Sequence, residues 1–268
     1  MRTAVRVPGR AGALLAGLGD RAVLHDVYDE VGASVYHDVS VRDTHEVREL
    51  VGLVRGTPGD VLELAAGSGR LTLPLLALGR EVTALELSAG MLALLGDRLA
   101  QAPARLRNAC TPVRADMSAF DLGRRFAVVV LGTTSVSLLD AAGRAGLYAC
   151  VRDHLAPGGR FLLSTVDDLA DGGTEAEAVI DVVGASGRGY RMHEHWPPGG
   201  PTRVVTVFPA ELPDSGPVSV CTTSVGVLPA DRLAAELAAA GLPVTARHPL
   251  PAGGWRHRDV LLEAEAAA

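Results

Sequence analysis

The chain has 268 residues, 48% of them hydrophobic, and a formal net charge of −6 from 25 Lys and Arg against 31 Asp and Glu. This length suits one α/β domain with a modest insertion, and an acidic balance without a dense Lys/Arg block argues against nucleic acid as a partner. The three cysteines lie far apart in the sequence without CxxC spacing, which suggests neither a disulfide framework nor a zinc knuckle.

At the amino end, a short apolar run is broken by glycines and lacks a convincing cleavage site, so we expect an amphipathic helix rather than a signal peptide. No segment approaches the length needed to span a bilayer, and we predict a cytoplasmic protein that does not bind membranes.

Helical and strand periodicities alternate through the next part of the chain. The predicted helices lie near residues 44–55, 70–78, 89–100, 141–155 and 229–240. The predicted strands lie at residues 60–65, 81–86, 111–115, 125–131 and 160–166. This alternation predicts a parallel sheet that is doubly wound, with helices on both faces.

Past residue 167 the pattern changes to strands separated by Pro/Gly turns. The predicted strands lie at residues 190–196, 203–208 and 218–228. Two last strands follow, near residues 243–248 and 259–264. We therefore expect four segments: an N-terminal helical cap (1–55), an α/β core (56–167), an inserted antiparallel lid (168–228) and a C-terminal part that completes the core (229–268).

A turn of small residues follows the first core strand, in an acidic-x-small-x-Gly-x-Gly pattern formed by Glu63, Ala65, Gly67 and Gly69. Small residues let a ligand approach the backbone, and the first N–H groups of the next helix favour an anionic or carboxylate-bearing ligand. A dinucleotide fingerprint needs a third glycine where this chain has Thr72, so the match to that fingerprint is poor.

The ends of the next two strands indicate an adenosine pocket. Glu86 lies about 20 residues after the glycine turn, where an acid accepts both hydrogens of a ribose diol. Ser88 is placed to cap the helix that follows. Asp116 closes the third strand, where it is predicted to accept from an adenine amino group while Met91 and Met117 pack on the ring.

Four motifs in this order resemble the class I methyltransferases that use S-adenosylmethionine: Glu63 to Gly69, Glu86 to Leu92, Asp116-Met117, and Leu155 to Phe161. The resemblance covers about Tyr28 to Glu263. It implies a Rossmann-like, seven-stranded, mostly parallel sheet, a reversed hairpin as its last strand pair, S-adenosylmethionine as cofactor and S-adenosylhomocysteine as product.

The resemblance also implies which residues bind the cofactor. Arg70 is placed to meet the cofactor carboxylate, with an ordinary exposed arginine as the alternative, and backbone carbonyls after the fourth strand are expected near the methyl group. The expected cofactor-binding set is Glu63, Ala65, Gly67, Gly69, Arg70, Glu86, Leu87, Met91, Asp116, Met117, Leu131 and Gly132.

A narrower resemblance is to the N-methyltransferases of peptide natural products, both glycopeptide-antibiotic and daptide-type ribosomal peptide enzymes. It is carried by His25 to Glu30, Glu81 to Ser88, Asp116 to Phe120, Gly146 to Tyr148 and Gly253 to Leu262. Departures from the glycopeptide enzymes at Ser68 and at residues 131–137 favour the daptide type. The resemblance implies methylation, up to dimethylation, of a terminal primary amine.

Two other functions stay open from the sequence. The cofactor motifs do not encode the acceptor, so an O- or C-methyltransferase of a small secondary metabolite is one alternative. The other is a protein that binds the cofactor without turnover and acts as a partner in a biosynthetic complex.

Three residues are candidates for the catalytic side of the site. The resemblance puts Tyr28 and Tyr36 beside the sulfonium, with hinge packing as the alternative. His193 is a candidate general base or substrate contact, against an exposed polar face of a lid strand. His193 and His195 share one strand face, as metal ligands can, but no third ligand is evident and we predict no metal.

Overall fold

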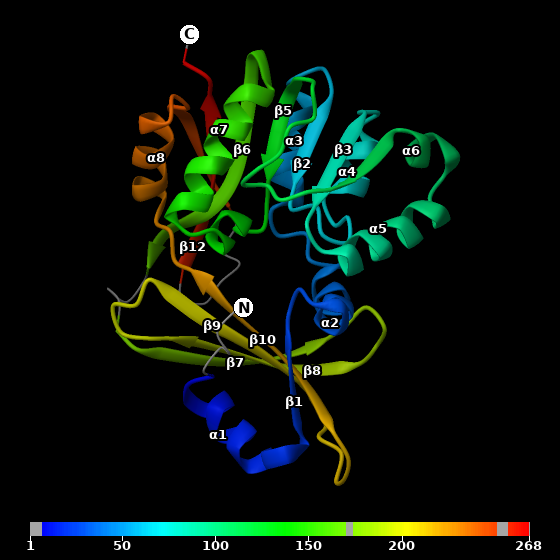
Figure 1. Ribbon diagram of the computed structural model, residues 1–268, viewed down its shortest axis with the longest axis vertical. Coiled ribbons are helices and arrows are strands. Elements are labelled where there is room, and N and C mark those ends of the chain that lie inside the picture. The colour runs from blue at the N-terminus through cyan, green and yellow to red at the C-terminus, as the bar shows by residue number, and fades with distance from the viewer. Residues whose placement is uncertain (1–6, 170–173, 251–256, 268) are drawn as a thin grey trace. The chain divides into compact units, whose positions relative to one another are not determined.

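A seven-stranded sheet is the framework of the larger part of the chain (Figure 1). The computed structural model describes residues 7–169, 174–250 and 257–267. The chain divides into two compact units: unit 1 comprises Met1–Asp43 and Asp171–Val227, and unit 2 comprises Thr44–Ala170 and Leu228–Ala268.

The sheet of unit 2 has the strand order β11-β12-β6-β5-β2-β3-β4, in which β12 runs antiparallel to both β6 and β11. Its strands are β2 (Val61–Leu64), β3 (Val82–Glu86), β4 (Cys110–Arg114), β5 (Phe126–Leu131), β6 (Leu155–Leu169), β11 (Val244–Pro249) and β12 (His257–Glu265). The expected doubly wound, mostly parallel methyltransferase-type sheet is confirmed.

Helices cover both faces of this sheet (Figure 1). They are α3 (Val47–Arg55), α4 (Thr72–Ala77), α5 (Ala89–Gln101), α6 (Ala104–Asn108), α7 (Ala141–His154) and α8 (Ala230–Ala239). Leucines and valines of α3, α4 and α5 pack against one face, and those of α7 and α8 against the other. Because β5 is buried on both sides, its run Phe126–Leu131 is continuously apolar rather than alternating.

Unit 1 is a five-stranded sheet of order β1-β10-β9-β8-β7 with one helix on each face (Figure 1). Its elements are α1 (Gly9–Leu18), β1 (Ala22–Asp26), α2 (Glu30–Ser40), β7 (Ala176–Val183), β8 (Gly189–Trp196), β9 (Thr202–Pro209) and β10 (Val218–Gly226). Asp29 caps α2 by accepting from the backbone N–H groups of Val31 and Gly32.

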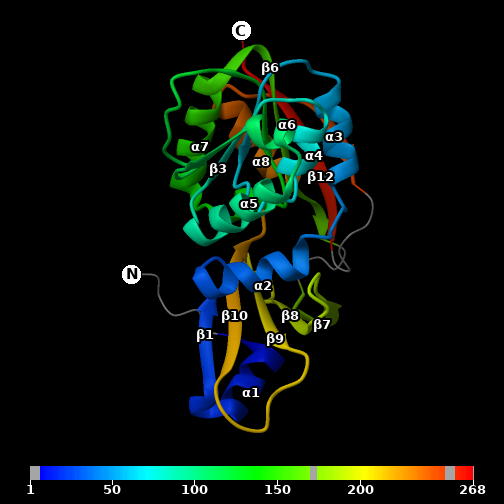
Figure 2. The ribbon, with the colours of Figure 1, turned by 90° about the vertical axis from the view of Figure 1, so that its right-hand side faces the viewer.

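The N-terminal segment does not form the purely helical cap that the sequence predicted. Residues 22–26 form β1, which lies beside β10 and pairs with it in parallel (Figure 2). Residues 7–43 therefore group with the antiparallel strands, whereas α3 packs on the core sheet. β1 is too short and too exposed for a clear period-2 signal, because Val23 and Leu24 both face solvent. Among the described residues, none of the helices combines the length and apolar character needed to cross a membrane.

Candidate functional site

The turn after β2 has the backbone that the small-residue pattern predicts. Ala65, Gly67 and Gly69 all adopt positive φ, at 51°, 56° and 85°. A Cβ on Gly67 would meet no atom of the described residues within 4 Å, so this glycine borders open space, whereas a Cβ on Gly69 would lie 2.5 Å from Leu95 Cδ1. Gly67 therefore leaves room for a ligand, and Gly69 is needed for packing against α5.

Glu86 ties this turn to the end of β3. Its Oε2 accepts from the Gly67 N–H at 2.9 Å and its Oε1 accepts from the Ser88 N–H at 2.8 Å. Ser88 caps α5 as predicted, since its hydroxyl accepts from the Met91 N–H at 3.4 Å. The carboxylate expected to receive a ribose thus also fixes the two loops between which a nucleoside would lie.

Glu63 lies within β2 rather than in the turn, which corrects the sequence interpretation, and is only 2% exposed. Burial raises the pKa of its carboxyl to about 8, opposed by the Thr72 hydroxyl, which donates to Oε2 at 2.6 Å, and by the charge of Arg70. Thr72, the residue that breaks the dinucleotide fingerprint, is itself fully buried and serves as the partner of this acid.

The residues predicted to lie around the adenine differ in how exposed their side chains are. Asp116 is exposed, and its Oδ1 accepts from the N–H and hydroxyl of Ser118 at 2.8 and 2.7 Å. Leu87 is 57% exposed and offers apolar surface next to Glu86, whereas Met91 is 1% and Met117 8% exposed. Met91 has almost no surface for a ring, because it faces the core from α5, so its expected packing on adenine is wrong in this conformation.

Arg70 is held in an ion pair that the sequence did not reveal. Its guanidinium pairs with Glu46, and its Nη2 donates to the Thr133 hydroxyl at 2.6 Å. The two charged side chains are only 10% and 4% exposed, so the alternative of an ordinary exposed arginine is wrong. Glu46 also accepts from the Thr133 N–H, at 2.8 Å through Oε1 and 2.9 Å through Oε2.

The chain after β5 turns sharply at this ion pair. Leu131 is fully buried, and a Cβ on Gly132 would lie 2.4 Å from Leu71 Cδ1 and 3.0 Å from Glu46 Oε1. Thr133 and Thr134 then adopt left-handed conformations, with φ of 59° and 51°. Such a conformation costs a β-branched residue about 1–3 kcal/mol and persists only where its surroundings enforce it.

The carboxyl ends of β2, β3, β4 and β5 thus bring together most of the predicted cofactor residues. Open space at Gly67, the exposed Leu87, the Asp116 carboxylate and the Arg70 cation suit a ligand with a nucleoside at one end and a carboxylate at the other. S-adenosylmethionine is such a ligand, and the residues present fit it.

Tyr28 and Tyr36 belong to unit 1, where their rings lie 5.6 Å apart between centroids. They pack with residues of α2 and with one face of the sheet, formed by Tyr190, Met192, Val205, Val207 and Cys221. The structure therefore brings the two predicted tyrosines together on the α2 face.

His193 lies on the other face of that sheet. It pairs in register with Thr206, and its ring contacts Phe208 edge-on at 5.4 Å, in the layer that α1 covers. His193 therefore does not lie beside Tyr28 and Tyr36, because alternating residues of a strand face opposite sides of its sheet, and its role as a general base or substrate contact stays a prediction. The exposed alternative is wrong, since His193 is only 6% exposed.

His193 and His195 do share a strand face, as expected, but their surroundings do not resemble a metal site. His195 is 3.2 Å from Glu177 Oε1, which also accepts from the Arg10 N–H. Burial lowers the pKa of His193, whose Nε2 meets no hydrogen-bond partner within the described part of the chain. No group of three or more potential ligands gathers within residues 7–169, 174–250 and 257–267.

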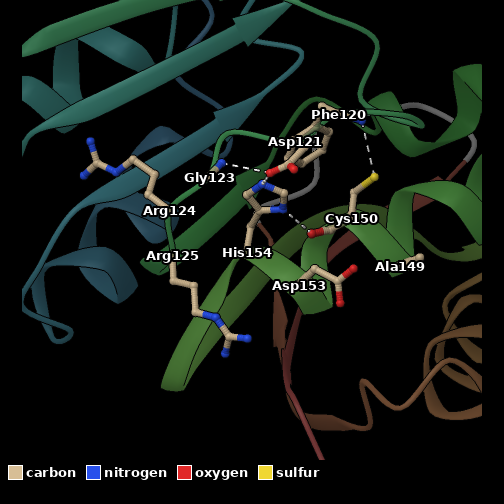
Figure 3. Close-up of a pocket in the computed structure, with 9 residues that line it drawn as sticks. All are labelled: Phe120, Asp121, Gly123, Arg124, Arg125, Ala149, Cys150, Asp153 and His154. Carbon is tan, nitrogen blue, oxygen red and sulfur yellow. Dashed lines mark hydrogen bonds and ion pairs between the residues drawn. The ribbon is translucent and has the colours of Figure 1, made fainter.

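A surface pocket of about 360 Å³ lies at the opposite, amino-terminal edge of the parallel strands (Figure 3). His154, the buried histidine there, has both ring nitrogens engaged: Nε2 accepts from the Leu122 N–H at 2.9 Å, and Nδ1 donates to the Cys150 carbonyl at 2.7 Å. These contacts hold the connection between β4 and β5, so we assign His154 a structural role.

Sequence reasoning missed several residues that build the site. Glu46 and Thr133 meet across 87 positions, Ser164 Oγ accepts from the Thr134 N–H at 2.9 Å, and Arg98 Nη1 donates to the Ser68 carbonyl at 2.8 Å. From the sequence, Glu46 could be identified only as a polar residue at the start of a predicted helix. Nothing local marked any of them as partners of the glycine turn.

Comparisons with known proteins agree with this geometry. A family model described as a methyltransferase domain matches residues 61–159. A crystal structure of the glycopeptide N-methyltransferase MtfA with S-adenosyl-L-homocysteine is 42% identical, with 98% of this chain and 100% of that chain covered and a TM-score of 0.70. MtfA with S-adenosyl-L-methionine matches at 40% identity, with 98% and 99% covered and a TM-score of 0.69.

A more distant match is the CcbJ methyltransferase from Streptomyces caelestis, at 24% identity with 91% of this chain and 99% of that chain covered and a TM-score of 0.75. At this identity the match supports the fold alone. Among curated protein sequences, none matches the chain.

Proposed function

This chain belongs to the family of S-adenosylmethionine-dependent methyltransferases that includes the glycopeptide N-methyltransferase MtfA, and on that premise we propose that it methylates a terminal primary amine of a peptide natural product. The proposed reaction adds one methyl group and then a second. The setting we propose is the biosynthesis of a peptide antibiotic, of either the glycopeptide or the ribosomal, daptide-like kind.

The observation that carries this proposal is the extent of the likeness. At 42% identity, the match to MtfA extends over 98% of this chain, so it includes unit 1 as well as the cofactor-binding sheet. Cofactor motifs are common to methyltransferases with many acceptors, whereas similarity outside them bears on the acceptor. An O- or C-methyltransferase with an unrelated acceptor would not need this likeness in unit 1.

The composition of the site argues against a degenerate cofactor pocket. Gly67 borders open space, Glu86 joins the two loops and Asp116 has a carboxylate at the surface. A protein that binds the cofactor without turnover and acts as a partner in a biosynthetic complex would keep the same set, and mass spectrometry of the reaction products distinguishes that role from catalysis.

When bound, S-adenosylmethionine supplies a methyl group on a positively charged sulfur. The chain then has to hold an acceptor in line with that group and keep water away. We propose Tyr28 and Tyr36 as the residues on the acceptor side, because their rings lie together on the α2 face of the unit 1 sheet and remain partly exposed. No metal or buried base is required, since the amine loses its proton before it reacts.

The pH dependence of the rate follows from the acceptor itself. A peptide α-amine has a pKa of about 8, and only its neutral form has a lone pair. We expect kcat/KM to rise with pH below about 8 and to level off above it. A rate that falls over this range would argue against an amine acceptor.

Mass spectrometry of reactions with S-adenosylmethionine tests the proposal. The substrates are linear peptides with a free N-terminal amine, the same peptides acetylated at that amine, and peptides with an amine at the C-terminal end. We expect a gain of one or two methyl masses, lost on acetylation if the N-terminal amine reacts. The modified end distinguishes glycopeptide-like from daptide-like substrates.

An Asp116→Ala enzyme is the negative control, and small phenols and carboxylates are the competing acceptors. Methylation of a phenol or carboxylate and of no peptide would replace the proposal with the small-metabolite function. Cofactor binding without methylation of any acceptor in the panel would favour the non-catalytic partner.

A further inference from the structure

Glu46 lies at the N-terminus of α3, outside every motif of the cofactor site, yet it joins two parts of that site. It pairs with Arg70 at the end of the glycine turn and accepts from both the N–H and the hydroxyl of Thr133. We propose that Glu46 is a positioning residue for the amino-acid end of the methyl donor, acting through Arg70 and Thr133.

The burial of the pair supports a role in geometry rather than in stability. The side chains of Arg70 and Glu46 are only 10% and 4% exposed. Removing a carboxylate and a guanidinium from water offsets most of their attraction, so a buried pair contributes little net stability compared with apolar residues of similar size. What such a pair provides is a fixed direction for both groups.

The turn after β5 gives a second, independent observation. Thr133 and Thr134 both have positive φ, although both are β-branched. Their N–H groups are held by Glu46 and by Ser164, the latter at 2.9 Å and from a residue only 1% exposed. Strain that is enforced in this way is concentrated at functional sites, where it fixes groups that would otherwise relax.

The chemistry of the donor identifies which end is affected. Its amino-acid end carries a carboxylate, and Arg70 is the cation that follows directly on Gly69 in the turn. The charges form one connected group, because Arg70, Glu46 and Glu86 all act on the Glu63 carboxyl. Glu46 therefore fixes where the cation lies within a cluster that is otherwise acidic.

Replacing Glu46 by glutamine would break this arrangement. Both oxygens of Glu46 accept from the Thr133 N–H, so an amide nitrogen in either place would face a donor. Arg70 would lose its counter-charge and would move toward water. We therefore expect weaker binding of ligands that carry the amino-acid end.

The test compares two ligands by isothermal titration calorimetry with the full chain. S-adenosylhomocysteine has the amino-acid end, and 5′-methylthioadenosine has the same nucleoside and sulfur without it. For Glu46→Gln we expect the Kd of S-adenosylhomocysteine to rise at least about tenfold and that of 5′-methylthioadenosine to change less than about twofold.

Glu236→Gln is the matched control. Glu236 binds the buried Arg144 of α7 through two contacts of 2.7 and 2.8 Å, on the face of the sheet away from Glu46. This variant also removes a carboxylate from a buried arginine, so it should lower the melting temperature while leaving the Kd of both ligands unchanged.

Three results would overturn the proposal: equal losses for both ligands, tighter binding of S-adenosylhomocysteine because Arg70 has been freed, or no change. If Glu46→Gln does not fold, Thr133→Ala and Thr133→Ser replace it, since the hydroxyl contacts both Arg70 and Glu46. Alanine should weaken S-adenosylhomocysteine binding selectively, and serine should restore it; equal effects of the two variants would reject the role.

This inference rests on the cofactor and not on the proposed acceptor. Binding is measured without any methyl transfer, so failure to methylate peptides leaves the result interpretable. Conversely, an unchanged Kd in the variants would leave the proposed amine acceptor untouched.

Discussion

Replacing Glu63 by glutamine should remove a large part of the pH dependence of folding. Glu63 is 2% exposed, and burial raises the pKa of its carboxyl from 4.5 to about 8. The hydrogen bond from Thr72 and the charge of Arg70 lower this pKa, while Glu86 and Glu46 raise it, and desolvation outweighs them all. Folded Glu63 is therefore protonated at pH values where the unfolded chain has lost that proton.

The sign of the effect follows from proton counting. Between pH 4.5 and about 8 the folded state binds one more proton at this position than the unfolded state, so stability falls as pH rises. At about 1.36 kcal/mol per pH unit, the whole interval corresponds to about 5 kcal/mol. Below pH 4.5 both states hold the proton, and this contribution is fully present.

Urea unfolding followed by circular dichroism at pH 5, 6, 7 and 8 measures this difference. Across the series, the free energy of unfolding of wild type should fall by several kcal/mol relative to that of Glu63→Gln. The glutamine stays neutral at every pH, and its amide oxygen can accept from Thr72. Thr72→Val should raise the pKa further and extend the loss to higher pH. Parallel profiles for wild type and Glu63→Gln would show that the carboxyl does not titrate in this range and would refute the reasoning.

The remaining predictions concern single side chains. Gly67→Arg should abolish S-adenosylhomocysteine binding, because the arginine side chain would fill the open space beside a residue with positive φ. The circular dichroism spectrum should stay that of wild type. Wild-type affinity in this variant would contradict the assignment of the pocket. His193→Ala should lower the free energy of unfolding by about 1–3 kcal/mol, and with it the melting temperature, because His193 packs on Phe208 under α1. The affinity for S-adenosylhomocysteine should not change. A wild-type melting temperature combined with lost turnover would restore a catalytic role for His193. Ser88→Ala should lower the free energy of unfolding by about 1 kcal/mol through loss of the α5 cap, and it should weaken cofactor binding only indirectly. An unchanged free energy of unfolding would mean that the cap does not stabilise the protein.

The strand ends of the core sheet could be predicted from the sequence because their signals are local. The glycine turn and the acid at the end of β3 lie at fixed spacings within single strand-turn-helix units. The predicted helices and strands of unit 2 agree with the observed bounds to within a few residues, except at β6, which runs from residue 155. Strand β7 fell in a stretch that looked too polar for a strand and was not predicted.

The partners of those motifs could not be predicted in the same way. Arg70 was identified, but Glu46 reaches it only because α3 packs on the same face of the sheet as α4. Met91 was expected at the ring, yet the orientation of α5 turns it into the core. Such outcomes depend on how helices pack, which no local spacing encodes.

The sequence by itself determined the class of fold and the order of the cofactor motifs, since periodicity and turn chemistry act between neighbouring residues. The methyl donor followed from the family resemblance that those motifs carry. Tertiary structure alone decided that residues 22–26 join the antiparallel sheet, that His193 faces α1 while Tyr28 and Tyr36 lie on the α2 face, and that Glu46 binds Thr133. The physical reason is that strand pairing, the choice of which sheet face a helix covers, and ion pairs between distant residues are settled when the packed elements meet.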